Sequence, residues 1–162
     1  YAYNEFVFEF LTKHDNDYLT ELHQLFMQKV IRPQMRPEGF KAIERHREAG
    51  HELVGITATS DFITAPIFRE FGINEIIATN AEIVDGKYTG KVINTACYQK
   101  GKLIRLEQWL EGRDVTESWA YSDSINDRFL LEHADHAIAV NPDDRLEALA
   151  KEQGWEIQDW SI

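Results

Sequence analysis

Two carboxylates four residues apart, Asp123 and Asp127, stand where a short apolar run at residues 119–121 gives way to a helical pattern. If a strand ends there and a helix begins, the two side chains can converge on one point. Carboxylates with serine and asparagine oxygens nearby suit Mg²⁺, and Asn126 could hold an anionic oxygen. The alternative is that Asp123 or Ser124 caps the helix while Asp127 complements its dipole.

Two further groups of polar residues could act on a phosphate. Thr57 and Thr59 lie where another strand is expected to end. Hydroxyls and backbone N–H groups at such a place can bind phosphate, although capping of the next helix would use the same residue types. Lys100 and Lys102 lie at the start of a predicted helix, where the helix dipole disfavours a cation. Their position therefore suggests a functional role. Together these groups supply an anion holder, a charge neutraliser and a metal site for phosphoryl transfer.

The segments that must position these residues alternate between strands and helices. Strands are expected at residues 52–59, 74–79, 117–123, 136–140 and 155–160, with helices at 60–72, 101–112, 126–134 and 143–154. Ser60 or Asp61 is expected to cap the first of these helices. Residues 81–93 read as a hairpin with Asp85 and Gly86 at its turn. This alternation predicts an α/β fold with a mainly parallel sheet, in which ligands bind beyond the carboxyl ends of the strands. A third polar cluster, residues 141–144, also falls at such an end.

The first third of the chain reads as helical. Apolar residues recur there at three- and four-residue steps and predict one buried helix face: Leu19, Leu22, Leu25, Phe26 and Val30. A second helix, over residues 37–50, is expected to turn Phe40 and Ile43 inward and to stop near Gly50.

Composition narrows the classes of function. The 162 residues suffice for one ordinary domain. A formal net charge of −11 disfavours nucleic-acid binding, and no apolar run reaches the length of a membrane span. The single cysteine, Cys97, excludes an internal disulfide and a cysteine-based zinc site. Since no export signal is visible, we expect a cytoplasmic protein.

In their order along the chain these segments resemble the haloacid dehalogenase-like hydrolases, in the phosphoserine-phosphatase-like branch (subfamily IB). The resemblance runs from about Arg36 to Leu146. "LVGITATSDFITAPI" looks like the second motif of that family, "KGKLIRLEQWL" its third and "YSDSINDRFLL" its fourth. "IIATNAEIVDGKYTG" is similar to a hairpin of this branch. The resemblance implies a Rossmann-like core and Mg²⁺-dependent hydrolysis of phosphomonoesters through an aspartyl-phosphate.

The resemblance also implies roles for the polar residues of the second and third motifs. Thr57, with the adjoining Ala58 and Thr59, would bind the phosphoryl oxygens. A lysine would neutralise nucleophile and phosphate, and both Lys100 and Lys102 are candidates, with Lys102 preferred.

For the fourth motif the resemblance implies a metal site. Asp123 would ligate Mg²⁺, Asn126 would lie near the phosphate, and Asp127 would hold the lysine and the metal with its water. The expected partner is a small phosphorylated metabolite, with phosphoserine as the default.

The first motif of the family, an apolar strand ending in Asp-x-Asp-x-Thr, is not found. Asp15 and Asp17 have the mutual spacing, but Leu19 occupies the threonine slot, and Asp15 reads as a helix cap. We therefore expect residues 1–35 to be the remnant of a helical cap and residues 36–162 a core lacking its first strand.

That expectation has consequences for activity and association. The chain alone would be inactive, and an incomplete sheet would invite self-association. The alternative function is a non-catalytic relative that binds phosphate, metal or a partner.

Overall fold

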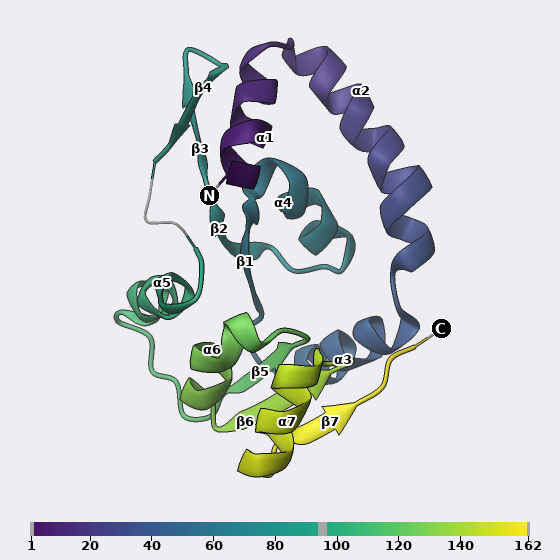
Figure 1. Ribbon diagram of the computed structural model, residues 1–162, viewed down its shortest axis with the longest axis vertical. Coiled ribbons are helices and arrows are strands. Elements are labelled where there is room, and N and C mark those ends of the chain that lie inside the picture. Colours follow the sequence, from purple (N-terminus) through teal and green to yellow (C-terminus); the bar gives the residue numbers. More distant parts are fainter. Residues whose placement is uncertain (1, 94–96, 162) are drawn as a thin grey trace. The chain divides into compact units, whose positions relative to one another are not determined.

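A computed structural model describes residues 2–93 and 97–161 (Figure 1). The chain forms two compact units, Tyr1–Cys97 and Tyr98–Ile162. This division differs from the predicted one after residue 35, which separates cap from core and stays a prediction. No helix in the described ranges is both long and apolar enough to cross a membrane.

The first unit carries four α-helices and four strands among its described residues. The helices are α1 (Ala2–Thr12), α2 (Asn16–Phe26), α3 (Pro37–Glu48) and α4 (Asp61–Glu70), and α2 continues as a π-helix, η1 (Met27–Ile31), and a 3₁₀ turn, η2 (Arg32–Gln34). The strands are β1 (Val54–Ser60), β2 (Glu75–Thr79), β3 (Ala81–Val84) and β4 (Lys87–Val92). β1 and β2 pair in parallel, whereas β3 and β4 form the predicted hairpin.

Local sequence explains the turns and helix ends of this unit. Asp85 and Gly86 both have positive φ, 49° and 76°, as the tight hairpin turn requires. Ser60 caps α4, since its Oγ accepts a hydrogen bond from the Phe62 N–H at 3.2 Å. Gly55 lets α4 pack closely on β1: a Cβ there would lie 2.5 Å from the Phe68 ring.

The core of the first unit joins α1 to the hairpin and to α4. Its buried members are Val7, Phe8, Leu11, Leu19 and Ala81, with Phe10, Phe62, Ile63 and Tyr88 packed around them. Figure 1 shows α1 beside β3 and β4, with α4 next to β1 and β2. These contacts place the first helix of the chain close to the strand that carries Thr57.

Two burial predictions for this unit are wrong in part, although Leu19 is buried and Phe26 and Ile43 are partly buried as expected. On α2 only Leu19 is buried, and Leu22 and Leu25 are 37% and 43% exposed. The packed side of the helix runs instead through Leu19, His23 and Met27, so it is rotated away from the most apolar stripe.

On α3, Gly39 and Ala42 are buried, whereas Phe40 is 40% exposed. Phe40 lies against Phe71, with ring centroids 4.5 Å apart, so its partner is another partly exposed ring rather than the core. Val30, in η1, is exposed as well.

The second unit is a three-stranded parallel sheet with helices. Its elements are α5 (Lys100–Leu110), β5 (Trp119–Ser122), the 3₁₀ turn η3 (Ile125–Asp127), α6 (Arg128–His133), β6 (His136–Val140), α7 (Asp144–Gln153) and β7 (Glu156–Gln158). The strand order is β5-β6-β7. Leu131 of α6 and Leu146 of α7 pack on Ala137 and Ala139, so both helices cover one face of this sheet (Figure 1).

The predicted α/β class is confirmed, and the parallel strands form two separate pieces. Among the strands of the described residues, β1 pairs only with β2, and β5 pairs only with β6. Among the described residues β1 and β5 are therefore edge strands. Thr57 and Thr59 lie within β1, and the cluster with Asp123 and Asp127 follows β5.

Candidate functional site

In the second unit, Lys102 and Asp127 form a shielded ion pair. The Lys102 Nζ donates to Asp127 Oδ1 at 2.5 Å, and the two side chains are only 10% and 15% exposed. The hydroxyl of Ser122, the last residue of β5, donates to Asp127 Oδ2 at 2.8 Å. Both carboxylate oxygens of Asp127 are therefore engaged, one by an ammonium and one by a hydroxyl.

The two candidate lysines differ in their surroundings. Lys102 is buried in the first turn of α5, a position where both the helix dipole and burial disfavour a cation unless a carboxylate compensates. Lys100 instead lies 5.5 Å from the centroid of the Phe129 ring. The contact with Asp127 favours Lys102 for the neutralising role, which stays a prediction.

Asp123 has an available carboxylate. The side chain is exposed, and within the described ranges no hydrogen bond or ion pair uses it; its backbone carbonyl accepts a hydrogen bond from Asp143 N at 2.8 Å. Ser124 caps η3 by accepting from the Asn126 N–H at 3.3 Å, as the structural alternative anticipated. Asp123 thus fits a hard cation, whereas the engaged oxygens of Asp127 fit a lysine-holding role better than direct ligation.

A complete metal shell is not assembled by this unit. Among the residues that the structure describes, no group of three or more His, Cys, Asp or Glu side chains could hold an ion. Asn126 follows Asp123 by three residues, and its Oδ1 accepts a hydrogen bond from the Tyr98 hydroxyl at 3.4 Å. That contact leaves the amide N–H groups of Asn126 as the part able to meet an anion.

The third polar cluster is structural. Asp143 caps α7 by accepting from Arg145 N at 3.1 Å and Leu146 N at 2.9 Å, and its other oxygen accepts from Ile125 N at 2.9 Å. The hydrogen bonds from these backbone N–H groups lower the pKa of Asp143, and that from Ile125 has the largest effect. Asp143 therefore ties α7 to η3 and supports the loop that carries Asp123.

In the first unit, Thr57 lies in an irregular part of β1. The pairing with β2 shifts register between Ile56 and Ser60. The Thr59 N–H donates to Thr57 Oγ1 at 3.1 Å, so the Thr57 oxygen accepts and its hydroxyl hydrogen is left to donate elsewhere. The Thr59 N–H, which was expected to face a phosphate, is engaged by this bond.

The carbonyl of Ala58 is held by two side chains that sequence reasoning missed. Asn4 Nδ2 of α1 donates to it at 3.1 Å, and Thr79 Oγ1 of β2 donates at 2.9 Å. The position of Thr79 at the end of a predicted strand could have indicated a role near the site, whereas no sequence pattern around Asn4 indicates one.

Asp61 was considered only as a cap, and it does more. Its Oδ1 accepts from Phe62 N at 2.8 Å, and its Oδ2 accepts from Asn80 Nδ2 at 2.8 Å. Burial, with a smaller contribution from the Asp61 charge, raises the pKa of Tyr88. Asp61 thus joins the start of α4 to the residue that leads into the hairpin.

Asp15 and the predicted phosphate-site residues lie in different parts of the chain. Asp15 is the N-cap of α2, with Oδ1 accepting from Tyr18 N at 2.8 Å, which confirms the capping interpretation. Thr57 belongs to the first unit, whereas Lys102, Asp123 and Asp127 belong to the second. The gathering of these groups around one phosphoryl site stays a prediction.

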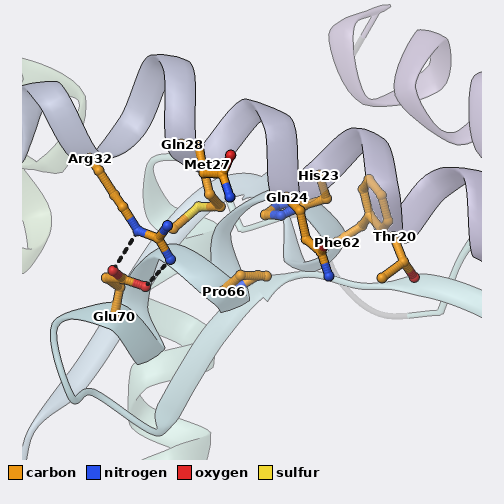
Figure 2. A pocket seen from close by; sticks show the side chains of 9 residues that line it. All are labelled: Thr20, His23, Gln24, Met27, Gln28, Arg32, Phe62, Pro66 and Glu70. Carbon is orange, nitrogen blue, oxygen red and sulfur yellow. Dashed lines mark hydrogen bonds and ion pairs between the residues drawn. The ribbon is translucent and has the colours of Figure 1, made fainter.

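A cavity of about 510 Å³ opens in the first unit between α2, its continuation and α4 (Figure 2). Arg32 and Glu70 close one end, with Nε–Oε1 and Nη2–Oε2 distances of 2.8 and 3.3 Å. His23 shares a hydrogen bond of 3.1 Å with the Ile63 carbonyl. The cavity is lined by none of the residues predicted to act on phosphate.

The motifs and the α/β units define a class of enzyme. The family model of the haloacid dehalogenase-like hydrolases matches residues 2–132. The chain therefore belongs to the haloacid dehalogenase-like hydrolase family.

Individual relatives sharpen this assignment. The chain is 40% identical over 153 residues to a histidinol-phosphatase of Neisseria meningitidis, covering 91% of this chain and 69% of that protein. It is also 40% identical over 121 residues to the phosphoserine phosphatase SerB1 of Mycobacterium tuberculosis, covering 74% of this chain but only 39% of the relative.

One solved structure is similar over nearly the whole chain. A protein of unknown function from Bordetella pertussis has a TM-score of 0.92 and 39% identity, covering 98% of this chain and 73% of that one. The family and these relatives support a phosphatase.

Proposed function

We propose that the protein containing this chain is an Mg²⁺-dependent phosphomonoester hydrolase that works through an aspartyl-phosphate. The observation that carries the proposal is the shielded Lys102–Asp127 pair, which Ser122, the residue directly before the exposed Asp123, also holds by a hydrogen bond. Membership of the family supports it. A buried ammonium and an uncommitted carboxylate, both tied to the end of β5, suit a site that must neutralise a phosphate and hold a cation.

Each side chain then has a stated task. Lys102, fixed by Asp127, offsets the negative charge of nucleophile and phosphate. The Thr57 hydroxyl and the Asn126 amide donate to phosphoryl oxygens, since their acceptor atoms are already engaged. Asp123 supplies a carboxylate ligand for Mg²⁺, and the bound ion would polarise the phosphoryl group.

The nucleophile is proposed to come from outside these 162 residues. No Asp-x-Asp-x-Thr occurs in the sequence, and Asp15 is a helix cap. We therefore expect negligible hydrolysis by this chain alone and turnover by a protein that also carries such a motif.

The substrate is proposed to be a small phosphomonoester. Histidinol phosphate and phosphoserine are the first candidates, because relatives that are 40% identical are named for these activities.

The test measures phosphate release from both compounds by the full-length protein, with Mg²⁺ and with excess EDTA. Asp123→Asn should lower kcat/KM by about 100-fold, as expected for loss of a group that stabilises transition-state charge. Asp144→Asn, an exposed carboxylate in the first turn of α7, is the matched control and should retain activity.

Three results would overturn the proposal. They are full activity in EDTA, full activity of Asp123→Asn, and turnover by the 162-residue chain equal to that of the longer protein. Binding of phosphate without any turnover by the full-length protein would favour the non-catalytic alternative.

A further inference from the structure

We infer that Asn4 is a positioning residue for the phosphate-binding hydroxyl of Thr57; this inference rests on the proposed function. Asn4 belongs to α1 and reaches a carbonyl 54 residues later in the chain, that of Ala58 in β1, at 3.1 Å. Thr79 of β2 donates to the same oxygen at 2.9 Å. The contact lies in the stretch between Ile56 and Ser60 where the β1–β2 register shifts.

The geometry of one peptide unit links Asn4 to Thr57. The carbonyl of Ala58 and the N–H of Thr59 belong to the same planar peptide group and point in opposite directions. Two donors on the carbonyl oxygen therefore fix the direction of the Thr59 N–H. That N–H donates to Thr57 Oγ1 at 3.1 Å, so the Thr57 oxygen is held as an acceptor and its hydrogen must point elsewhere.

The amide orientation of Asn4 follows from the same contact. With the amide flipped, its oxygen would face the Ala58 carbonyl oxygen, and two acceptors would repel each other. Nδ2 therefore faces Ala58, and Oδ1 points away from it. Among the described side chains, Oδ1 of Asn4 is the one buried polar atom without a hydrogen-bond partner.

The unpartnered oxygen argues against a purely stabilising role. A buried acceptor without a donor costs about 1–3 kcal/mol, comparable to or larger than the gain from one neutral hydrogen bond. Leucine has nearly the shape of asparagine and would fill the position without that cost. A group with this energetic balance needs another reason to be present, and orientation of the Ala58–Thr59 peptide supplies one.

Thr79 alone constrains the peptide less well than the pair does. Its hydroxyl donates to Ala58 from β2 and also accepts from the Cys97 N–H at 3.5 Å. Asn4 adds a second donor from a different element, so the carbonyl is held from α1 and from β2 together. The first helix thereby acts on a phosphate-binding group that it does not touch.

The test compares Asn4→Leu with the matched variant Asn16→Leu in the full-length protein. Asn16 Nδ2 also donates to a backbone carbonyl of the first unit, that of Gly86 at 2.9 Å, but at an exposed site away from Thr57. The readouts are inhibition by inorganic phosphate, kcat, KM and the melting temperature.

Asn4→Leu should weaken inhibition by phosphate about two- to tenfold, the equivalent of one neutral hydrogen bond. It should lower kcat similarly and leave the melting temperature unchanged or higher. Asn16→Leu should leave phosphate inhibition unchanged. Unchanged phosphate inhibition and kcat in Asn4→Leu would overturn the inference, and so would losses matched by Asn16→Leu.

A second variant gives a readout that a structural role would not produce. In Asn4→Asp, the protonated carboxyl can donate to the Ala58 carbonyl, whereas the ionised form repels it. Phosphate inhibition, taken relative to Asn16→Asp at each pH, should therefore recover as the pH falls from 7 towards 4. A ratio that does not change with pH would contradict the inference.

Thr57→Val separates the inference from the function on which it rests. If Thr57→Val does not weaken phosphate inhibition, or if the wild-type protein is not inhibited at all, the proposed role of Thr57 fails and the inference fails with it. If Thr57→Val weakens inhibition but Asn4→Leu does not, the inference alone fails.

Discussion

Thr57 in the first unit and Asp127 in the second are both fixed next to the end of a parallel strand, but by different kinds of contact. Asp127 is held by an ammonium and a hydroxyl on its two oxygens. Thr57 is held through a peptide group whose carbonyl accepts from an amide and a hydroxyl. One arrangement depends on charge, and the other uses only neutral groups.

The difference predicts how each region responds to the loss of one partner. Removal of one member of a shielded ion pair leaves a charge with neither water nor counter-ion, which is more costly than an unmade neutral hydrogen bond. Loss of one member of the charged arrangement around Asp127 should therefore cost more stability than loss of one donor in the neutral arrangement around Thr57.

The largest effect is expected for Lys102→Met, which keeps the aliphatic stem and removes the ammonium. Asp127 would remain shielded and unpaired, and the free energy of unfolding should fall by about 3 kcal/mol. Urea denaturation at pH 7 measures it. Lys100→Met, which removes only an ammonium 5.5 Å from the Phe129 ring centroid, should cost less than about 1 kcal/mol. Equal losses of unfolding free energy in Lys102→Met and Lys100→Met would show that the ion pair with Asp127 does not stabilise the second unit.

A smaller effect is expected for Thr79→Val in the first unit. Valine matches the shape of threonine but cannot donate to the Ala58 carbonyl, and Thr79 is 1% exposed. The free energy of unfolding should fall by about 1–2 kcal/mol, measured by the same denaturation. Thr89→Val is the control, because Thr89 bonds to Glu82 at an exposed site. A loss for Thr79→Val larger than that for Lys102→Met would reverse the comparison.

The smallest effect is expected for Asp143→Ala, and it depends on pH. Loss of an exposed N-cap should cost about 1 kcal/mol at pH 7. Because the folded-state pKa of Asp143 is lowered from 3.8, its contribution is present above that value and is lost as the pH falls through the folded pKa.

The stability difference between wild type and Asp143→Ala should therefore shrink below about pH 4. Denaturation curves at pH 7 and pH 3 measure it, with Asp144→Ala as the control. A stability difference that does not change with pH would show that the backbone N–H contacts of Asp143 do not favour its ionised form.

Local patterns in the sequence predicted much of the fold, because the features concerned depend on neighbouring residues. The Asp85–Gly86 turn and the Ser60 cap require only specific φ angles or a side-chain oxygen at one position. The pairing of Asp127 with a lysine was implied by the resemblance, but the choice between Lys100 and Lys102 needed the contact itself.

Other features could not be read from the sequence because they depend on the tertiary arrangement. The packed side of α2 is decided by which side chains meet α4, so His23 packs there while the more apolar Leu22 is exposed. The Asn4–Ala58 contact joins residues with no shared local pattern. The engagement of both Asp127 oxygens also depends on the tertiary arrangement, whereas spacing alone suggested a metal ligand.

The close approach of Gly55 to Phe68 restricts the order in which this chain can accumulate substitutions. Because the Phe68 ring occupies the space that any side chain at position 55 would need, with an added Cβ at 2.5 Å, enlargement of residue 55 is tolerated only after residue 68 has become smaller. The reverse order passes through an overpacked intermediate, so the two positions should change as a coupled pair along any evolutionary path.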